Sequence, residues 1–222
     1  MKNLLLNVLV KFISGIIVMA AIIFIPAGTL NFWNGWLYLV TMLILVSFAF
    51  VYLKKHDPEL LKKRMQIHEK QKEQKLFVKI STPLFIVIFI IPGLDFRFGW
   101  SHMPHEVVIA ATVVMILSYI MFLFVMIQNS YASRVIEIQK GQKVIDTGLY
   151  AVVRHPMYLA MSVLFPSTMF VLGSYYSLIP MIFLPFLLVY RIIHEEKLLI
   201  KELPGYKEYT KKVKYRLIPF VW

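Results

Sequence analysis

Residues 106–128, EVVIAATVVMILSYIMFLFVMIQ, decide the class of fold for this chain. The stretch carries one charged residue, the glutamate at its first position, and almost everything else in it is apolar. A helix of about 20 such residues crosses the roughly 30 Å of hydrocarbon in a bilayer, so we predict a membrane-spanning helix here. Three further stretches meet the same criterion, at residues 4–26, 32–53 and 76–94.

Two shorter apolar stretches follow, at residues 157–172 and 177–192. The four residues at 173–176, GSYY, are typical of a tight helical hairpin with an aromatic pair at the membrane interface. We therefore expect an all-α fold, a polytopic transmembrane helical bundle with about six spans and a C-terminal helical hairpin. Five crossings plus a hairpin is the alternative. The first stretch is too long for a secretory signal and lacks a small-residue cleavage pattern, so we expect it in the mature protein.

The composition agrees with a membrane protein and excludes several classes of function. Of the 222 residues, 59% are hydrophobic and 16% are charged, which is too apolar for an ordinary soluble domain. Because there is no cysteine, disulfides, thiolate metal sites, a cysteine nucleophile and palmitoylation are excluded. No two glycines are spaced as G-x-G, so neither a dinucleotide fingerprint nor a P-loop is present. A nucleotide-like cofactor must therefore be held in another way.

The net charge of +12 is concentrated in segments that flank the predicted spans. Nine basic residues lie at 54–79, four at 134–154, eight from Arg191 onward, and two are Lys2 and Lys11. With six crossings all of these fall on or near the side that holds the N-terminus, and only Arg97 does not. Cytoplasmic loops carry such an excess, so we expect a multi-pass membrane protein with both termini cytoplasmic. Its positive charge would face the anionic lipid bilayer, and we expect no nucleic-acid partner.

Two further polar segments have ordinary structural explanations. Residues 54–75 indicate a surface helix that is entered at Asp57-Pro58 and connects two spans. His102 and His105 are three residues apart, but Pro104 prevents a helical metal-binding face. We therefore expect no metal site.

Polar and ionisable residues that topology does not require gather in two places. The first is residues 139–158, QKGQKVIDTGLYAVVRHPMY, in which an extended stretch and a glycine turn precede Pro156, the expected first residue of the fifth span. The second is residues 191–196, RIIHEE, at the end of the sixth span. Because these two spans form a hairpin, their cytoplasmic ends are neighbours, and the two clusters should face one another.

The facing clusters admit two interpretations. Arg191 and Glu195 are four residues apart on one helix face, while Glu196 points about a quarter turn away. The start of the fifth span should offer free backbone N–H groups beside Arg154 and His155, which suit a carboxylate, and Glu195 suits an ammonium group or ribose hydroxyls. Alternatively, the arginine and glutamate of the sixth span pair only to hold the hairpin together, and Arg154-His155 merely lie at the membrane interface.

Four ordered motifs carry a resemblance to a known family. They are Gly148-x-Tyr150-x-x-x-Arg154-His155-Pro156-x-Tyr158, then Arg191-x-x-x-Glu195-Glu196-x-x-Leu199 after a hairpin, then Gly205-Tyr206-x-x-Tyr209, and Ile218-Pro219. In this order they resemble the isoprenylcysteine carboxyl methyltransferase family of integral membrane methyltransferases, which is related to the phospholipid N-methyltransferases. The resemblance covers about residues 129–220. It implies a methyltransferase that uses S-adenosylmethionine at a cytoplasmic cofactor site.

The resemblance also assigns roles to residues. The cofactor-binding residues that it implies are Gln139, Gln142, Lys143, Val144, Ile145, Tyr150, His155, Pro156, Met157, Tyr158 and Glu195. Arg191 is implied as the catalytic residue, on the acceptor side. We expect residues 1–128 to form N-terminal transmembrane helices with a cytoplasmic basic loop at 54–79. Residues 129–222 would then be the methyltransferase-like region.

The expected function is methyl transfer to the carboxylate or amine of a lipophilic small molecule. Displacement at a sulfonium needs positioning and desolvation more than it needs a base, and apolar walls between spans would admit a lipid tail. Two alternatives stay open, a non-catalytic membrane scaffold or transport protein and a sterol-reductase-like membrane oxidoreductase. The lysine-rich, cysteine-free chain favours a prokaryotic cell membrane, with a phospholipid, a fatty or isoprenoid acid or another small lipophile as acceptor.

Overall fold

The computed structural model describes residues 2–65 and 72–222, and over these residues it is helical without any strand. The elements are α1 (Lys2–Ala27), α2 (Trp33–His56), α3 (Pro58–Arg64), α4 (Lys72–Phe98), α5 (His105–Gln128), the 3-10 turn η1 (Gly148–Ala151), α6 (Pro156–Val171), α7 (Leu178–Met181), α8 (Phe183–Glu202) and α9 (Tyr206–Lys212). The predicted all-α helical bundle is confirmed.

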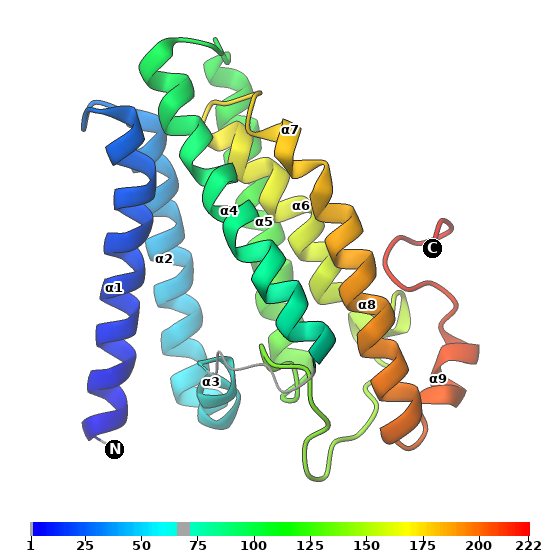
Figure 1. Ribbon diagram of the computed structural model, residues 1–222. Helices are drawn as coiled ribbons and strands as arrows, with labels where there is room; N and C mark the ends of the chain where they lie inside the picture. Colours follow the sequence, from blue (N-terminus) through cyan, green and yellow to red (C-terminus); the bar gives the residue numbers. More distant parts are fainter. Residues whose placement is uncertain (1, 66–71) are drawn as a thin grey trace.

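Among the described residues, five stretches of helix are long and apolar enough to cross a membrane. They are Val10–Ala27, Trp33–His56, Gln74–Phe98, His105–Gln128 and Leu178–Glu202. The fifth predicted span is α6, which has 16 residues and is therefore about 24 Å long, less than the roughly 30 Å of hydrocarbon. The structure thus combines five long apolar helices with one shorter apolar helix, and α6 and α8 form the predicted hairpin (Figure 1).

The long helices run alternately up and down the bundle (Figure 1). The start of α1, the short helix α3, the loop that follows α5, and α9 lie together at one end, which we call the basic end. The segments rich in lysine and arginine fall at this end because α2 and α8 finish there while α4 and α6 begin there. Arg97 lies near the opposite end of α4. The separation of charge expected from the sequence is therefore present in the fold.

Close packing of the helices depends on small residues and buried apolar side chains. A Cβ atom on Gly93 of α4 would lie 2.5 Å from the carbonyl oxygen of Ile23 in α1, so these two backbones approach as only glycine allows. Met115 of α5, Met169 of α6 and Leu188 of α8 are buried in the common core. Many apolar side chains on the outer faces are exposed, as expected for helices that face lipid.

The connector after α2 is tied to the bundle rather than lying freely on its surface. Asp57 caps α3 by accepting a hydrogen bond from the Leu60 amide at 2.9 Å, and Pro58 occupies the first turn, as predicted. Leu60 is fully buried in the core. The predicted surface helix at 54–75 is thus divided: residues 54–56 end α2, residues 58–64 form α3, residues 72–75 begin α4, and residues 66–71 lie outside the described residues.

Candidate functional site

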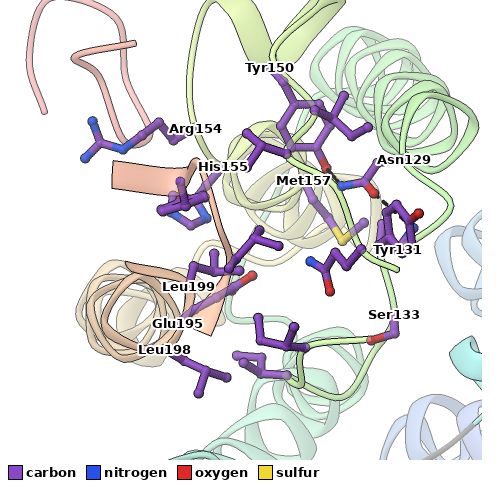
Figure 2. A pocket seen from close by; sticks show the side chains of 18 of the residues that line it. Asn129, Tyr131, Ser133, Tyr150, Arg154, His155, Met157, Glu195, Leu198 and Leu199 are labelled. Carbon is purple, nitrogen blue, oxygen red and sulfur yellow. Dashed lines mark hydrogen bonds between the residues drawn. The ribbon is translucent and has the colours of Figure 1, made fainter. Parts of the chain in front are cut away.

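A cleft opens at the basic end, where the loop after α5 meets the starts of η1 and α6, the end of α8, and α9. Nearly all of the residues predicted to bind a cofactor line it, and these are Gln142, Lys143, Val144, Ile145, Tyr150, His155, Pro156, Met157, Tyr158 and Glu195. Figure 2 shows Glu195 and Met157 reaching into the cleft from opposite sides. The two sequence clusters therefore face one another, as expected for the ends of a hairpin.

Two predicted site residues do not line the cleft. Gln139 lies in the loop behind it, where its side-chain amide donates to the Tyr131 carbonyl oxygen at 2.8 Å and its backbone N–H donates to the side chain of Gln142 at 2.9 Å. Arg191 does not line the cleft, but it contacts Tyr158, which does. Because the side-chain oxygen of Gln142 accepts the bond from Gln139, it is occupied by a contact within its own loop.

A glycine turn directs Tyr150 towards the cleft. Gly148 has a left-handed backbone, with φ of +57°, and a Cβ atom there would collide with the side chain of Gln128. The Gln128 side-chain oxygen accepts a hydrogen bond from the amide that follows the glycine, at 3.2 Å. The Tyr150 hydroxyl then accepts from the Asn129 side chain at 2.9 Å, and its carbonyl oxygen accepts from the Tyr209 hydroxyl at 2.7 Å. Tyr150 is thus held from two sides, and Figure 2 shows its contact with Asn129.

Three side chains of α6 and α8 form a hydrogen-bonded series at the cleft wall. The Tyr158 hydroxyl donates to a carboxylate oxygen of Glu195 at 2.6 Å, and Arg191 donates to the same hydroxyl through Nε at 3.0 Å. Arg191 also donates to the Arg134 carbonyl oxygen at 2.9 Å and lies 4.7 Å from the centre of the Phe77 ring. The tyrosine therefore links the cationic residue to the carboxylate that enters the cleft.

Glu196 is the centre of a second, buried network. Its carboxylate accepts from Nε of Arg154 at 2.6 Å and from Nε of Arg216 at 2.6 Å, and Nε2 of His155 lies 3.3 Å away. Arg154 also donates to the carbonyl oxygens of Val213 and of the next residue, at 2.7 and 2.9 Å. Figure 2 shows the Arg154 side chain directed away from the cleft. This network joins α6, α8 and the C-terminal segment.

These contacts bear on two features that the sequence indicated. An ion pair across the hairpin joins Arg154 to Glu196, and the C-terminal segment supplies further acceptors for Arg154. The backbone N–H groups of Arg154 and His155 donate at 2.9 Å to the carbonyl oxygens of residues 215 and 216, so the free N–H groups expected at the helix start are those that follow them. In the described part of the chain, the open amides of the helix start are those of Met157 and Tyr158.

Burial keeps the tyrosines of the cleft in the neutral form. It raises the pKa of Tyr150 to about 12, against a lowering effect of the hydrogen bond from Asn129. The pKa of Tyr206 and of Tyr209 also lies well above the ordinary value, first because of burial and then because of nearby negative charge. These rings therefore offer hydroxyl groups and aromatic faces rather than phenolate anions.

Two buried oxygen atoms near the cleft lack a hydrogen-bond partner among the described residues. They are the Tyr206 hydroxyl and the side-chain oxygen of Gln139. Leaving such a group unpaired costs roughly 1–3 kcal/mol. Tyr206 lines the cleft, so a ligand with a hydrogen-bonding group would satisfy its hydroxyl.

Sequence reasoning gave no individual role to several residues that line the cleft. They are Asn129, Tyr131, Ser133, Glu137, Tyr206 and Tyr209. The two tyrosines of α9 are three residues apart, and this spacing indicates that they share one helix face and point to the same side. The residues of the loop after α5 follow no helical or strand period, so nothing in their order indicated that they would turn inward.

The described residues contain no group of three or more histidine, aspartate and glutamate side chains placed to hold a metal ion. His105 is the first residue of α5, and its ring packs 5.1 Å from the ring of Trp33.

Comparison with known proteins identifies the class to which this cleft is similar. Residues 109–201 match the family model described as the isoprenylcysteine carboxyl methyltransferase (ICMT) family. The matched region runs from α5 to the end of α8 and contains most of the cleft. No curated protein sequence matches the chain. The resemblance found in the motifs is confirmed, and it supports a membrane methyltransferase of the ICMT kind.

Proposed function

We propose that this chain is an integral membrane methyltransferase that transfers a methyl group from S-adenosylmethionine to a lipophilic acceptor. The family match supplies the reaction class, and the five long apolar helices supply the membrane setting. The observation that carries the proposal is the Glu195 carboxylate, held in the cleft by Tyr158 and surrounded by aromatic rings and an unpaired Tyr206 hydroxyl. A cationic, hydroxyl-rich ligand with an aromatic base fits such a set.

The groups present in the cleft suit the different parts of this cofactor. Glu195 accepts hydrogen bonds from an ammonium group or ribose hydroxyls. The open amides of Met157 and Tyr158 suit a carboxylate at a helix start. The faces of Tyr150 and Tyr158 attract an adenine ring or a sulfonium. Tyr206 would gain the partner that it lacks.

The protein supplies position and a dry environment rather than an acid or a base. When bound, S-adenosylmethionine provides a methyl group whose S–C electron pair stays on sulfur while an acceptor oxygen or nitrogen forms the new C–O or C–N bond. Displacement of this kind depends on holding two reactants in line and excluding water. Arg191 does not line the cleft, so we assign it to the positioning of Tyr158, and through Tyr158 of Glu195.

The cleft must widen to take a ligand of this size. It encloses about 110 Å³, whereas small-molecule sites usually hold roughly 300–1,000 Å³. The wall without regular secondary structure is the loop 133–147, which is joined to α9 by the exposed ion pair of Asp146 with Lys212 at 2.7 Å. We therefore assign cofactor entry to this side, where the cleft meets the aqueous phase.

The charge distribution supports a cytoplasmic cleft. The basic end of the bundle carries the loop and helix ends that form the site, and basic loops stay on the cytoplasmic side. Both termini would then be cytoplasmic, in a prokaryotic cell membrane. A reporter fused after Trp222 should give a cytoplasmic signal, and an external signal would reverse the orientation.

Titration calorimetry on the purified protein in detergent tests the proposal directly. We expect S-adenosylmethionine to bind, Glu195→Gln to weaken binding about 10- to 100-fold through loss of a charge-assisted hydrogen bond, and Glu208→Gln on α9 to leave it unchanged. A reduced nicotinamide dinucleotide should not bind. If the folded wild-type protein binds the dinucleotide, or binds neither ligand, the proposal of an S-adenosylmethionine-dependent methyltransferase is wrong.

A further inference from the structure

The chain after α9 turns back along the bundle, away from the basic end. Figure 1 shows this C-terminal segment, residues 213–222, running from α9 towards the middle of the bundle. Leu217 is buried in the main hydrophobic core, and Trp222 packs against that core. The turn between them exposes three apolar side chains instead, Ile218 at 45%, Phe220 at 88% and Val221 at 74%. We call these three side chains the apolar tip.

The length of α6 fixes the depth at which this segment lies. Four residues after α6, the exposed pair Tyr175 and Tyr176 marks the membrane interface opposite the basic end. From that end α6 extends about 24 Å, less than the roughly 30 Å of hydrocarbon. The amides of Arg154 and His155, just before α6, donate to the carbonyl oxygens of residues 215 and 216 at 2.9 Å. The apolar tip, which follows these residues, therefore lies at the level of the bilayer.

The backbone of the turn is largely bonded to itself, as irregular structure at this level requires. The backbone oxygen of Trp222 accepts from the amides of residues 216, 217 and 218 at 2.9, 3.0 and 3.3 Å. The Ile218 carbonyl oxygen accepts from the amides of residues 221 and 222 at 3.2 and 3.1 Å, and Pro219 has no amide hydrogen. Because residues 216 and 222 are bonded to one another, the turn enters and leaves on the same side of the bilayer.

Phe220 is directed outwards by a strained backbone. Its φ is +65°, and among the described residues it is the one residue other than glycine with a left-handed backbone. A bulky side chain rarely adopts this conformation, and such strain persists where the surroundings impose it, often at functional positions. In water neither the strain nor the exposed ring is compensated, whereas burial of the ring among acyl chains compensates both.

We propose that the apolar tip inserts into the leaflet at the basic end, among the acyl chains next to the head groups. Lys214 and Arg216 precede the tip, and basic side chains beside an apolar group are the composition that binds an anionic membrane interface. Bilayer contact would also hold the segment against the site. The reason is that the same segment supplies carbonyl oxygens to Arg154 and the guanidinium that pairs with Glu196. This inference does not depend on the reaction that the protein catalyses.

The depth of the tip can be measured directly, because the chain has no cysteine and a single introduced one can carry a label. We expect bimane on Val221→Cys, in vesicles of phosphatidylcholine and phosphatidylglycerol, to be quenched by brominated acyl chains about as strongly as bimane on Phe186→Cys, an exposed position of α8. Aqueous iodide should quench it much less than bimane on Glu208→Cys of α9. Quenching by iodide as at Glu208, or protection from both quenchers, would overturn the proposal, since the tip would then lie in water or against protein.

Substitution of Phe220 tests the contact without a label. Aspartate adopts a left-handed backbone more readily than phenylalanine, but it is unfavourable in hydrocarbon. In lipid nanodiscs, Phe220→Asp should therefore speed hydrogen exchange of the Arg154 and His155 amides about tenfold or more, whereas Phe220→Leu should leave it within about twofold. A tip in water predicts the opposite sign, because aspartate would relieve the strain. Exchange in Phe220→Asp at or below the wild-type rate would refute insertion.

Discussion

Replacing Glu196 by glutamine removes the negative charge that three cationic or titratable side chains share. Arg154 and Arg216 each donate to its carboxylate at 2.6 Å, and His155 lies 3.3 Å away. Glu196 is 3% exposed and Arg154 is 7% exposed, so water cannot take the place of the lost charge. The variant leaves the Arg154 guanidinium buried without an anion.

The structure sets the expected size of this effect. Removing one partner of a buried ion pair costs about 3–5 kcal/mol. Glu195→Gln at the adjacent position is a matched control, because its carboxylate accepts from the neutral Tyr158 hydroxyl and an amide oxygen can accept the same bond. That change should cost about 0.5–1.5 kcal/mol of stability while it weakens cofactor binding strongly. Glu196→Gln should therefore lower mainly the stability of the protein, and Glu195→Gln mainly its affinity for the cofactor.

Unfolding by denaturant in mixed detergent micelles measures the stability, and titration calorimetry of the folded fraction measures the affinity. We expect the unfolding midpoint of Glu196→Gln to fall well below that of Glu195→Gln, and the order to be reversed for affinity. Equal unfolding midpoints would refute the assignment of Glu196 as the buried anchor of the C-terminal segment.

Four other changes test separate parts of the site. Arg191→Lys keeps the charge but loses the planar guanidinium that contacts both Tyr158 and the Arg134 carbonyl oxygen, so the affinity for S-adenosylmethionine should fall about three- to tenfold. An unchanged affinity by calorimetry would contradict a positioning role for Arg191. Gly148→Ala forces a side chain into a left-handed turn and should destabilise the protein by about 1 kcal/mol or more, which a denaturant midpoint detects, and an unshifted midpoint would contradict it. Because the pKa of Tyr150 is raised to about 12, the stability that its neutral side chain contributes is complete below pH 10 and is lost as the pH rises to about 12. The difference in stability between wild type and Tyr150→Phe should therefore narrow over that pH range. A constant difference in thermal unfolding would contradict this expectation. Amides of the loop 133–147 should exchange up to about 100-fold more slowly at a cofactor concentration of 100 Kd, and unchanged deuterium uptake would mean that the loop does not close over the ligand.

The apolar helices and their ends were readable from the sequence because the information is local. In a bilayer, a run of about 20 apolar residues satisfies its backbone hydrogen bonds by forming a helix. Pro156 begins α6, as its fixed backbone angle predicts. The short loop between α6 and α8 also required their ends to be neighbours. Hence the meeting of the two polar clusters followed from the chain itself, whereas the individual cofactor-binding residues, most of which line the cleft, were those that the family resemblance implied.

The sequence by itself determined the membrane class, the helical hairpin and the place where the polar clusters meet, because hydropathy and short loops act between near neighbours. Only the tertiary structure decided that Arg154 pairs with Glu196, since the deciding carbonyl oxygens of residues 213 and 214 lie about 60 positions away along the chain. It also decided that Arg191 contacts Tyr158 and that Arg64 contacts Met157, at the wall of the cleft. Such contacts depend on which side chains meet across packed helices, and no periodicity or spacing along the chain encodes that meeting.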